Sequence, residues 1–188
     1  MNGELFTKPL RSAKAKLEYV CGGEEETYCP KFTFMGFRYA ELCGIEPENV
    51  KVRMKVISSI DEETGDFFCS NESINRLQKN IRYSGFSNFL EIPTDCPQRD
   101  ERLGWTGDIS VFASTACFNF NMNRFLRKWL IDVKAQQTKD GGIPSLFLGS
   151  NISAEQRLRP AGPTVFSLSR GRFIKTAGTK PFLKSFIR

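Results

Sequence analysis

Residues 93 to 108 read Pro-Thr-Asp-Cys-Pro-Gln-Arg-Asp-Glu-Arg-Leu-Gly-Trp-Thr-Gly-Asp, and this stretch decides how the whole chain is interpreted. It holds four acids, two arginines and one tryptophan between two helical patterns. A solvated loop seldom keeps a large indole among so many charges. A sugar-cleaving site needs carboxylates for proton transfer, arginine for hydroxyl groups and an aromatic wall for the sugar ring. The alternative interpretation is a capped helix start with surface ion pairs.

The spacing of two acids in this stretch predicts a compact loop. Asp95 and Glu101 are six positions apart, which would separate them by about 240° around a straight α-helix and by roughly 20 Å along a strand. Neither element would aim both carboxylates at one small ligand. Gly104 and Gly107 permit sharp turns, and Asp108 is expected in the first turn of the next helix. Backbone N–H groups there favour a carboxylate, so helix capping is the structural alternative for Asp108.

Residues 95–108 resemble the signature of the bacterial α-L-rhamnosidases of glycoside hydrolase family 78. Three upstream segments extend the resemblance over roughly residues 4–156, namely Pro30–Tyr39, Gly65–Asn71 and Asn88–Pro93. The family usually has histidine where this chain has Met35. A continuous match of fourteen residues is far more specific than a short glycine motif.

The resemblance implies a role for five residues of the segment. Glu101 matches the family's general acid, which protonates the glycosidic oxygen as the aglycone leaves. Asp95, Arg99 and Asp108 match residues that hold the rhamnose hydroxyl groups, and Trp105 matches an aromatic residue of the sugar subsite. The family is inverting, so a second carboxylate about 6.5–9.5 Å away must activate water. In the family this base is a glutamate on a much later part of the barrel, and we expect this chain to end before it.

The electrostatics of a general acid constrain the two arginines of the segment. A general acid must be protonated near neutral pH, which requires burial or neighbouring negative charge. Trp105 would supply an apolar wall, and three acids would supply like charge, namely Asp95, Asp100 and Asp108. Arg99 and Arg102 would oppose this effect if they pointed at Glu101. We therefore predict that Arg99 faces the substrate and that Arg102 turns away into a structural ion pair.

Composition excludes several other classes of protein. The 188 residues include six cysteines without a CxxC pair and no histidine, so we predict no metal site and no cofactor. Cys96 lacks a histidine to activate it as a nucleophile, and reduced thiols are favoured over disulfides. The chain has neither a membrane-span pattern nor an apolar leader at its start, and a cytoplasmic location is expected, with export as the alternative if the start is a truncation.

The net charge of +6 comes from the last 32 residues. Residues 157–188 hold eight basic residues and no acid, which leaves 19 basic against 21 acidic residues in positions 1–156. Such a tail suits nucleic acid or anionic lipid, but it has no motif for either, and we expect neither partner. It departs from the family pattern, and a shifted reading frame near residue 157 is one hypothesis for it. We expect this non-family tail to be poorly ordered.

The first third of the chain has the alternation that is typical of β-strands. Apolar residues alternate with basic ones over residues 50–56, and a second strand with a bulge at Gly36 is predicted over residues 32–39. The sequence Gly-Gly-Glu-Glu-Glu at 22–26 predicts a turn. Residues 1–64 are therefore expected to form the end of a β-sandwich domain that packs on a larger one. The alternative is a sandwich that itself binds carbohydrate.

From Asn71 onward the apolar period becomes helical. The first stripe begins after a cap at Ser70 or Asn71 and comprises Ile74, Leu77 and Ile81. Two further stripes follow, one over Ile109, Phe112, Ala113, Ala116, Cys117 and Phe120, the other over Met122, Phe125, Leu126, Trp129, Leu130 and Val133. Trp129 is predicted to be a core residue, and Gly141–Pro144 is predicted to end the last helix. The resemblance implies that residues 65–156 open an (α/α)6 catalytic barrel.

The predicted fold class is thus α+β, a partial β-sandwich followed by the first helices of an (α/α)6 barrel, truncated and with a basic tail. The expected function is that of a fragment of an inverting α-L-rhamnosidase, which hydrolyses terminal α-L-rhamnose from glycosides or oligosaccharides. It would carry the general acid without the general base and be weak or inactive alone. The alternative is a non-catalytic rhamnose-binding module. Apolar faces left without neighbours predict self-association.

Overall fold

The protein is described from a computed structural model, which covers residues 5–139, 141–144 and 146–147. The chain divides into two compact units. The first comprises Met1–Val56 together with Cys96–Arg102, and the second comprises Ile57–Asp95 together with Leu103–Arg188. The motif at residues 93–108 is called the candidate segment from here on. Its middle, Cys96–Arg102, therefore belongs with the N-terminal part of the chain. The predicted basic tail, residues 157–188, lies outside the described residues.

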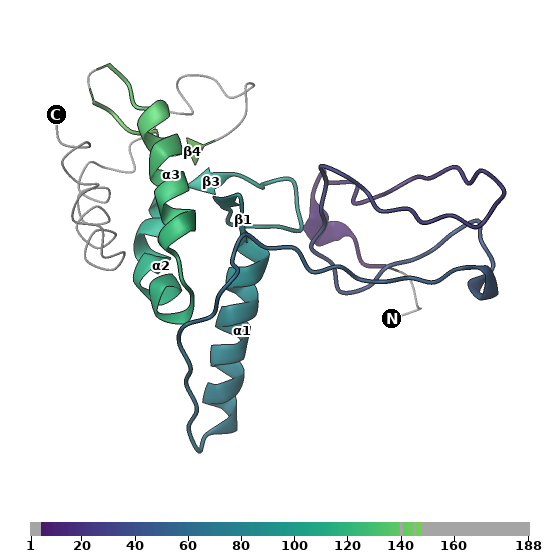
Figure 1. Ribbon diagram of the computed structural model, residues 1–188, viewed down its shortest axis with the longest axis horizontal. Helices are drawn as coiled ribbons and strands as arrows, with labels where there is room; N and C mark the ends of the chain where they lie inside the picture. The colour runs from purple at the N-terminus through teal and green to yellow at the C-terminus, as the bar shows by residue number, and fades with distance from the viewer. Residues whose placement is uncertain (1–4, 140, 145, 148–188) are drawn as a thin grey trace. The chain divides into compact units, whose positions relative to one another are not determined.

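The first unit is irregular rather than a sheet. It contains two short 3-10 helices, η1 (Lys8–Leu10) and η2 (Pro47–Asn49), and none of its described residues forms a β-strand. Figure 1 shows this part of the chain, in purple and blue, as long smooth loops. The strands predicted for residues 32–39 and 50–56 are therefore not formed.

The physical reason is visible in the exposure of the alternating face. Val52, Met54 and Val56 are 67%, 72% and 76% exposed, so within this unit no second layer covers the face that the alternation predicts to be buried. A strand also needs a neighbouring strand for its N–H and C=O groups. The described residues of this unit therefore contain no paired strands, and its place as the end of a β-sandwich domain stays a prediction.

The turn at the Gly-Gly-Glu-Glu-Glu sequence is confirmed. Gly23 has φ of 94°, and the Glu26 carboxylate accepts a hydrogen bond of 2.7 Å from the N–H of Gly22. The rings of Tyr19 and Tyr28 stack across the turn with centroids 4.2 Å apart.

The described residues of the second unit form three α-helices, as predicted. α1 spans Glu72–Asn88, α2 spans Thr106–Asn119 and α3 spans Asn123–Ala135 (Figure 1). The cap of α1 is Asn71, whose side chain accepts from the N–H groups of Ser73 and Ile74. None of the helices that the structure describes is long and apolar enough to cross a bilayer.

The core of this unit lies chiefly on α2 and α3. Trp129 is only 2% exposed, which confirms its prediction as a core residue. The described apolar residues that are buried are Ile60, Phe89, Ile92, Ile109, Ala113, Ala116, Phe120, Met122, Phe125, Leu126, Trp129 and Val133. The apolar stripes of α2 and α3 therefore pack inward as their period predicts.

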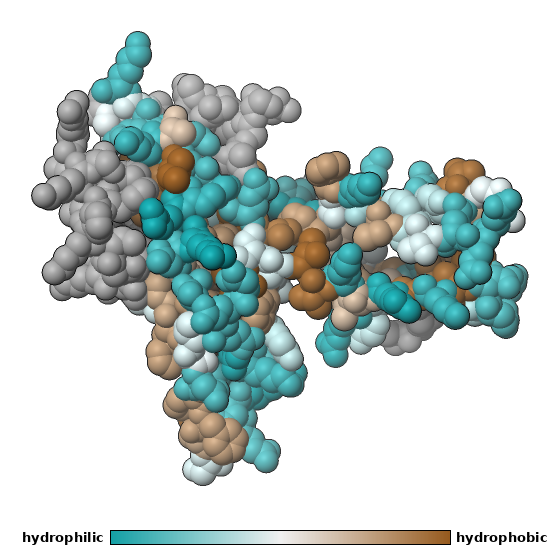
Figure 2. Space-filling view, viewed as in Figure 1, coloured by the Kyte–Doolittle hydropathy of each residue, from teal (hydrophilic) through white to brown (hydrophobic). Residues whose placement is uncertain are grey.

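The apolar stripe of α1 is largely uncovered. Ile74 and Leu77 are 45% and 58% exposed, and Phe67 and Phe68 just before the helix are 45% and 84% exposed. Figure 2 shows apolar side chains, in tan, at the surface around the N-terminal end of α1. The period of the sequence predicted this helix correctly, but the stripe has little to pack on among the described residues.

The end of α3 comes earlier than predicted. The helix stops at Ala135 with Gln136 as its C-cap, whereas the Gly141–Pro144 segment was expected to end it. A tight turn follows, in which the N–H of Thr138 donates to the carbonyl of Gly142 at 2.9 Å. Gly141, with φ of 88°, serves this turn and not the helix end.

Two short antiparallel pairs frame the candidate segment. β1 (Phe89–Leu90) pairs with β2 (Ile92–Pro93), and β3 (Gly104–Trp105) pairs with β4 (Leu146–Phe147). The chain therefore leaves α1 through a tight hairpin and enters α2 directly from β3 (Figure 1).

Candidate active site

The two residues that flank the loop at 95–103 are paired with each other in the second unit. Thr94 forms an antiparallel bridge with Gly104, so residues 95–103 are a closed loop and not a straight helix or strand. This confirms the compact loop predicted from the spacing of the acids. Gly104 and Gly107 do not form the expected turns, because they lie in β3 and α2 and neither has a positive φ.

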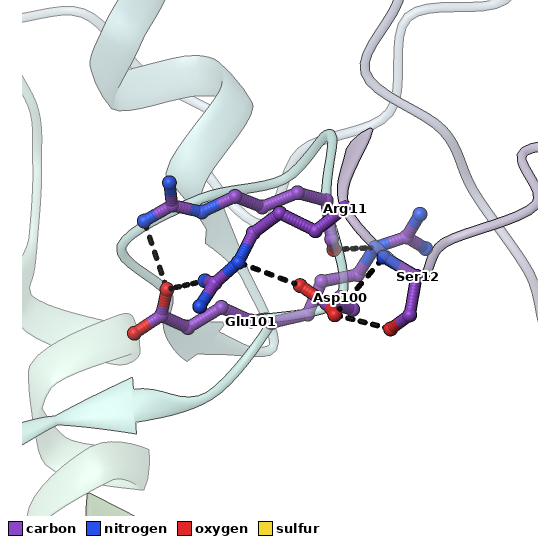
Figure 3. A network of polar contacts seen from close by, with 6 residues as sticks. Arg11, Ser12, Asp100 and Glu101 are labelled. Carbon is purple, nitrogen blue, oxygen red and sulfur yellow. Dashed lines mark hydrogen bonds and ion pairs between the residues drawn. The ribbon is translucent and has the colours of Figure 1, made fainter. Parts of the chain in front are cut away.

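Glu101 is held by two guanidinium groups of the first unit (Figure 3). Arg11 Nη1 lies 2.6 Å and Arg99 Nη2 lies 2.8 Å from Glu101 Oε2. The Glu101 side chain is 29% exposed, so it is partly shielded from solvent. The structure therefore brings Arg99 and Glu101 together, whereas Arg99 was predicted to face the substrate without pointing at Glu101.

Asp100 is fixed by the residue after Arg11. Its Oδ2 accepts hydrogen bonds from the hydroxyl of Ser12 and, at 3.2 Å, from the N–H of Ser12. Arg11 Nε lies 3.6 Å from Asp100 Oδ1. The Ser12 hydroxyl lowers the pKa of Asp100, with smaller contributions from the Ser12 N–H and the Arg11 charge that partial desolvation opposes. Asp100 is therefore engaged with Arg11 and Ser12 (Figure 3).

Arg102 turns away from Glu101, as predicted, but it binds different partners from those expected. Its Nη1 donates to the carbonyl of Phe34 at 2.6 Å and its Nε donates to the carbonyl of Arg99 at 3.2 Å. The guanidinium carbon lies 5.1 Å from the centre of the Phe34 ring. Among the described residues these carbonyl and ring contacts replace the predicted ion pair.

The other three predicted site residues lie in the second unit. Asp95 follows Thr94 and is half-buried. Trp105 ends β3 and precedes α2, and its Nε1 is buried without a hydrogen-bond partner among the residues that the structure describes. Asp108 is exposed in the first turn of α2, as predicted, where the helix N-terminus favours its charge. Trp105, and not Asp108, is the N-cap residue of α2.

None of the six cysteines forms a disulfide, and desolvation by burial raises the pKa of Cys117. In the described part of the chain no three residues of the metal-binding types gather into a group that could hold an ion.

Four residues that contact the loop were not selected from the sequence, namely Arg11, Ser12, Phe34 and Gly36. A Cβ on Gly36 would lie 3.1 Å from Gln98 Cβ, so the missing side chain allows the loop to approach. Phe34 and Gly36 lie in the Pro30–Tyr39 segment that carries the resemblance, and this was the available signal. No sequence signal identified Arg11 and Ser12, because their contacts span about 90 positions of sequence.

Two family models match almost the whole described chain. A model described as the bacterial alpha-L-rhamnosidase 6 hairpin glycosidase domain matches residues 62–148. A model described as the bacterial alpha-L-rhamnosidase concanavalin-like domain matches residues 1–60.

Curated relatives agree with these models. An alpha-L-rhamnosidase of Streptomyces avermitilis is 46% identical over 145 residues, which cover 76% of this chain and 14% of that protein. An alpha-L-rhamnosidase of Formosa agariphila is 43% identical over 148 residues, which cover 76% of this chain and 16% of that protein. The chain thus spans less than a fifth of the length of these relatives.

Solved structures give the same answer for the fold. The structure of an α-L-rhamnosidase from Aspergillus terreus matches with a TM-score of 0.68 and 42% identity, covering 78% of this chain and 18% of that one. An α-L-rhamnosidase from Dictyoglumus thermophilum matches with a TM-score of 0.50 and 39% identity, covering 59% and 12%. The helical unit therefore fits the region of a helical glycosidase barrel, and the chain belongs to the bacterial α-L-rhamnosidases, glycoside hydrolase family 78.

Proposed function

We propose that this chain carries the acid half of an inverting α-L-rhamnosidase site, with Glu101 as the general acid. In this role Glu101 gives its proton to the glycosidic oxygen while the bond from the rhamnose C1 to that oxygen breaks. The bonding electrons leave with the aglycone, and water supplies the hydroxyl group that replaces it. The substrate class is a glycoside or oligosaccharide with a terminal α-L-rhamnose.

The observation that carries this proposal is the way Glu101 is held within the family signature. Among the described residues, both contacts of its carboxyl group, from Arg11 and Arg99, are made to Oε2. The other oxygen, Oε1, has no hydrogen-bond partner among the described residues. A carboxyl group that is fixed through one oxygen can present the other to a substrate, which a general acid requires. The two guanidinium groups oppose protonation of Glu101, so the proposal also requires that burial by the bound substrate favours the protonated acid.

The remaining roles are assigned on the same signature. We assign Asp95, Arg99 and Asp108 to the rhamnose hydroxyl groups, because carboxylates and guanidinium groups bind vicinal hydroxyls through directed hydrogen bonds. We assign Trp105 to the apolar face of the sugar. Its buried indole N–H, which lacks a partner among the described residues, would gain one from a bound hydroxyl group.

No residue of this chain is assigned to the general base. An inverting enzyme needs a second carboxylate about 6.5–9.5 Å from the acid, so that a water molecule fits between them and the sugar. We place that residue on the part of the barrel that the longer relatives possess, and we propose that this chain alone hydrolyses rhamnosides weakly or not at all.

The test compares two samples. The first is the full 188-residue chain alone. The second, which we call the completed enzyme, is the same chain co-expressed with the region that follows the matched segment in the Streptomyces avermitilis relative. Hydrolysis of 4-nitrophenyl α-L-rhamnoside is expected only in the completed enzyme, and the first product seen by NMR should be β-L-rhamnose. The relative's region alone is the control. If the completed enzyme and the chain both bind rhamnose without cleaving the glycoside, the binding-module interpretation replaces this one.

A further inference from the structure

Arg11 contacts both acids at the centre of the candidate segment. Its Nη1 lies 2.6 Å from Glu101 Oε2, and its Nε lies 3.6 Å from Asp100 Oδ1 (Figure 3). One guanidinium group therefore spans two consecutive carboxylates across a separation of 90 positions in sequence. The planar fork of arginine is suited to such a contact, because its donors have fixed relative directions.

The neighbouring contacts leave Arg11 little freedom. Ser12 binds Asp100 through both its N–H and its hydroxyl group, which fixes the backbone directly after Arg11. Arg11 itself has φ of 58° and ψ of −119°, a conformation that residues with a Cβ rarely adopt. Such strain persists only where surrounding contacts over-determine the conformation.

The atom that Arg11 binds decides the chemistry of Glu101. In a protonated carboxyl group one oxygen is a carbonyl, which accepts hydrogen bonds, and the other is a hydroxyl, which donates one. Arg11 and Arg99 both donate to Oε2, so Oε2 is the carbonyl oxygen of the acid form. The proton is then carried by Oε1, the oxygen without a partner among the described residues.

We propose that Arg11 is a positioning residue that holds Glu101 through Oε2 so that Oε1 donates the proton, an inference that rests on the proposed function. When Oε1 gives its proton to the glycosidic oxygen, Glu101 becomes a carboxylate. The two hydrogen bonds on Oε2 then become charge-assisted and strengthen. The arginines therefore orient the acid before the transfer and stabilise the negative charge that the transfer leaves behind.

The competing explanation is a surface ion pair without a catalytic role. The Arg11 side chain is 53% exposed, and exposed ion pairs contribute little to stability. The two explanations differ in their dependence on the leaving group. Loss of proton donation slows the cleavage of an alkyl rhamnoside, whose aglycone leaves poorly, much more than that of a 2,4-dinitrophenyl rhamnoside. A general loss of structure would slow both substrates equally.

The experiment uses R11Q, R11G and R53Q. R11Q removes the charge and keeps the strained backbone, whereas R11G removes the side chain and relieves the strain. Arg53 is an exposed arginine of the same unit that forms no hydrogen bond or ion pair with the loop among the described residues, so R53Q is the matched control. In the full chain, three-bond side-chain couplings measured by NMR should report one rotamer of Glu101 in the native protein and in R53Q. They should report averaging in both Arg11 variants.

Kinetics in the completed enzyme then separate position from structure. Both Arg11 variants should lose about tenfold or more in kcat on methyl rhamnoside, as part of the 10²–10⁴ that a general acid contributes. They should lose little on the dinitrophenyl substrate and add no loss to E101Q. Glu101 couplings that stay unchanged in the Arg11 variants would overturn this inference alone. So would Arg11 variants that lose kcat equally on both substrates, if E101Q loses kcat mainly on methyl rhamnoside. If E101Q cleaves both substrates normally, the proposed function fails as well.

Discussion

The indole of Trp129 occupies the space that a side chain on Gly104 would need. A Cβ built on Gly104 would lie 2.8 Å from Trp129 Cη2 and 3.3 Å from Ile92 Cδ1. Gly104 also pairs with Thr94 and Phe147, so its backbone is held on two sides. The close approach of β3 to Trp129 in the core of the helical unit is therefore made possible by the absence of one methyl group.

The first prediction is that G104A destabilises the protein. Trp129 is 2% exposed and packed in the core, so it cannot move aside freely, and overpacking of this kind costs about 1–3 kcal/mol. The free energy of unfolding in urea measures the effect. G107A is the matched control, because a Cβ there meets nothing within 4 Å and alanine gains about 1 kcal/mol over glycine in a helix. A G104A protein as stable as the native chain would contradict this account of the packing.

The second prediction concerns the contact of the loop with residues 34–36. A Cβ on Gly36 would lie 3.1 Å from Gln98 Cβ and 3.3 Å from Gln98 Cα, so G36A should push the loop away and loosen the bond from Arg102 to Phe34. Faster amide hydrogen exchange is expected at residues 98–102. In G22A the new Cβ would meet only the Glu26 carboxylate, at 3.9 Å. Amide exchange at residues 98–102 of this control should match that of the native protein. Equal exchange in G36A and G22A would show that the close approach has no effect.

The third prediction follows from the lowered pKa of Asp100. Because the folded pKa lies below the value of about 3.9 in an unfolded chain, the contribution of Asp100 to stability is fully present above that value. It is lost as the pH falls through the folded pKa. The free energy of unfolding of D100N should therefore fall less steeply between pH 5 and pH 2 than that of the native chain. S12A removes the main cause of the shift and should behave like D100N; identical slopes in all three proteins would exclude this coupling.

The fourth prediction concerns the uncovered face of α1. Leu77 is 58% exposed beside Ile74 at 45%, and exposed apolar patches favour association. We expect the sedimentation coefficient of the isolated chain to rise with protein concentration and L77K to suppress this rise. N80K places the same charge on a polar, exposed position of α1 and should leave association unchanged. Association that is equal in L77K and the native chain would place the contact elsewhere.

Local signals in the sequence predicted the helical unit well. The stripes of α2 and α3 and the cap at Asn71 are set by residues within a few positions of one another, and all of them are present in the structure. The same period identified α1 but could not show that Leu77 lacks a cover. A hydrophobic stripe predicts which face of a helix is apolar, but it does not predict what packs on that face.

Non-local contacts account for what the sequence missed. The alternation at Val52 and Met54 is typical of a strand, but a ladder needs a partner strand, which the described residues of that unit do not provide. The pairing of Arg11 with Glu101 likewise joins positions 90 residues apart. The motif itself identified Glu101, whereas the partners of Arg102 include the distant carbonyl of Phe34, which no local signal indicated.

The most direct test of the central claim is the effect of E101Q on two substrates of the completed enzyme. If Glu101 is the general acid, kcat for methyl α-L-rhamnoside should fall by about 10²–10⁴, while kcat for the 2,4-dinitrophenyl rhamnoside, whose aglycone leaves without a proton, should change little. An E101Q enzyme that cleaves methyl rhamnoside at the native rate, or that loses activity equally on both substrates, would contradict the assignment of Glu101.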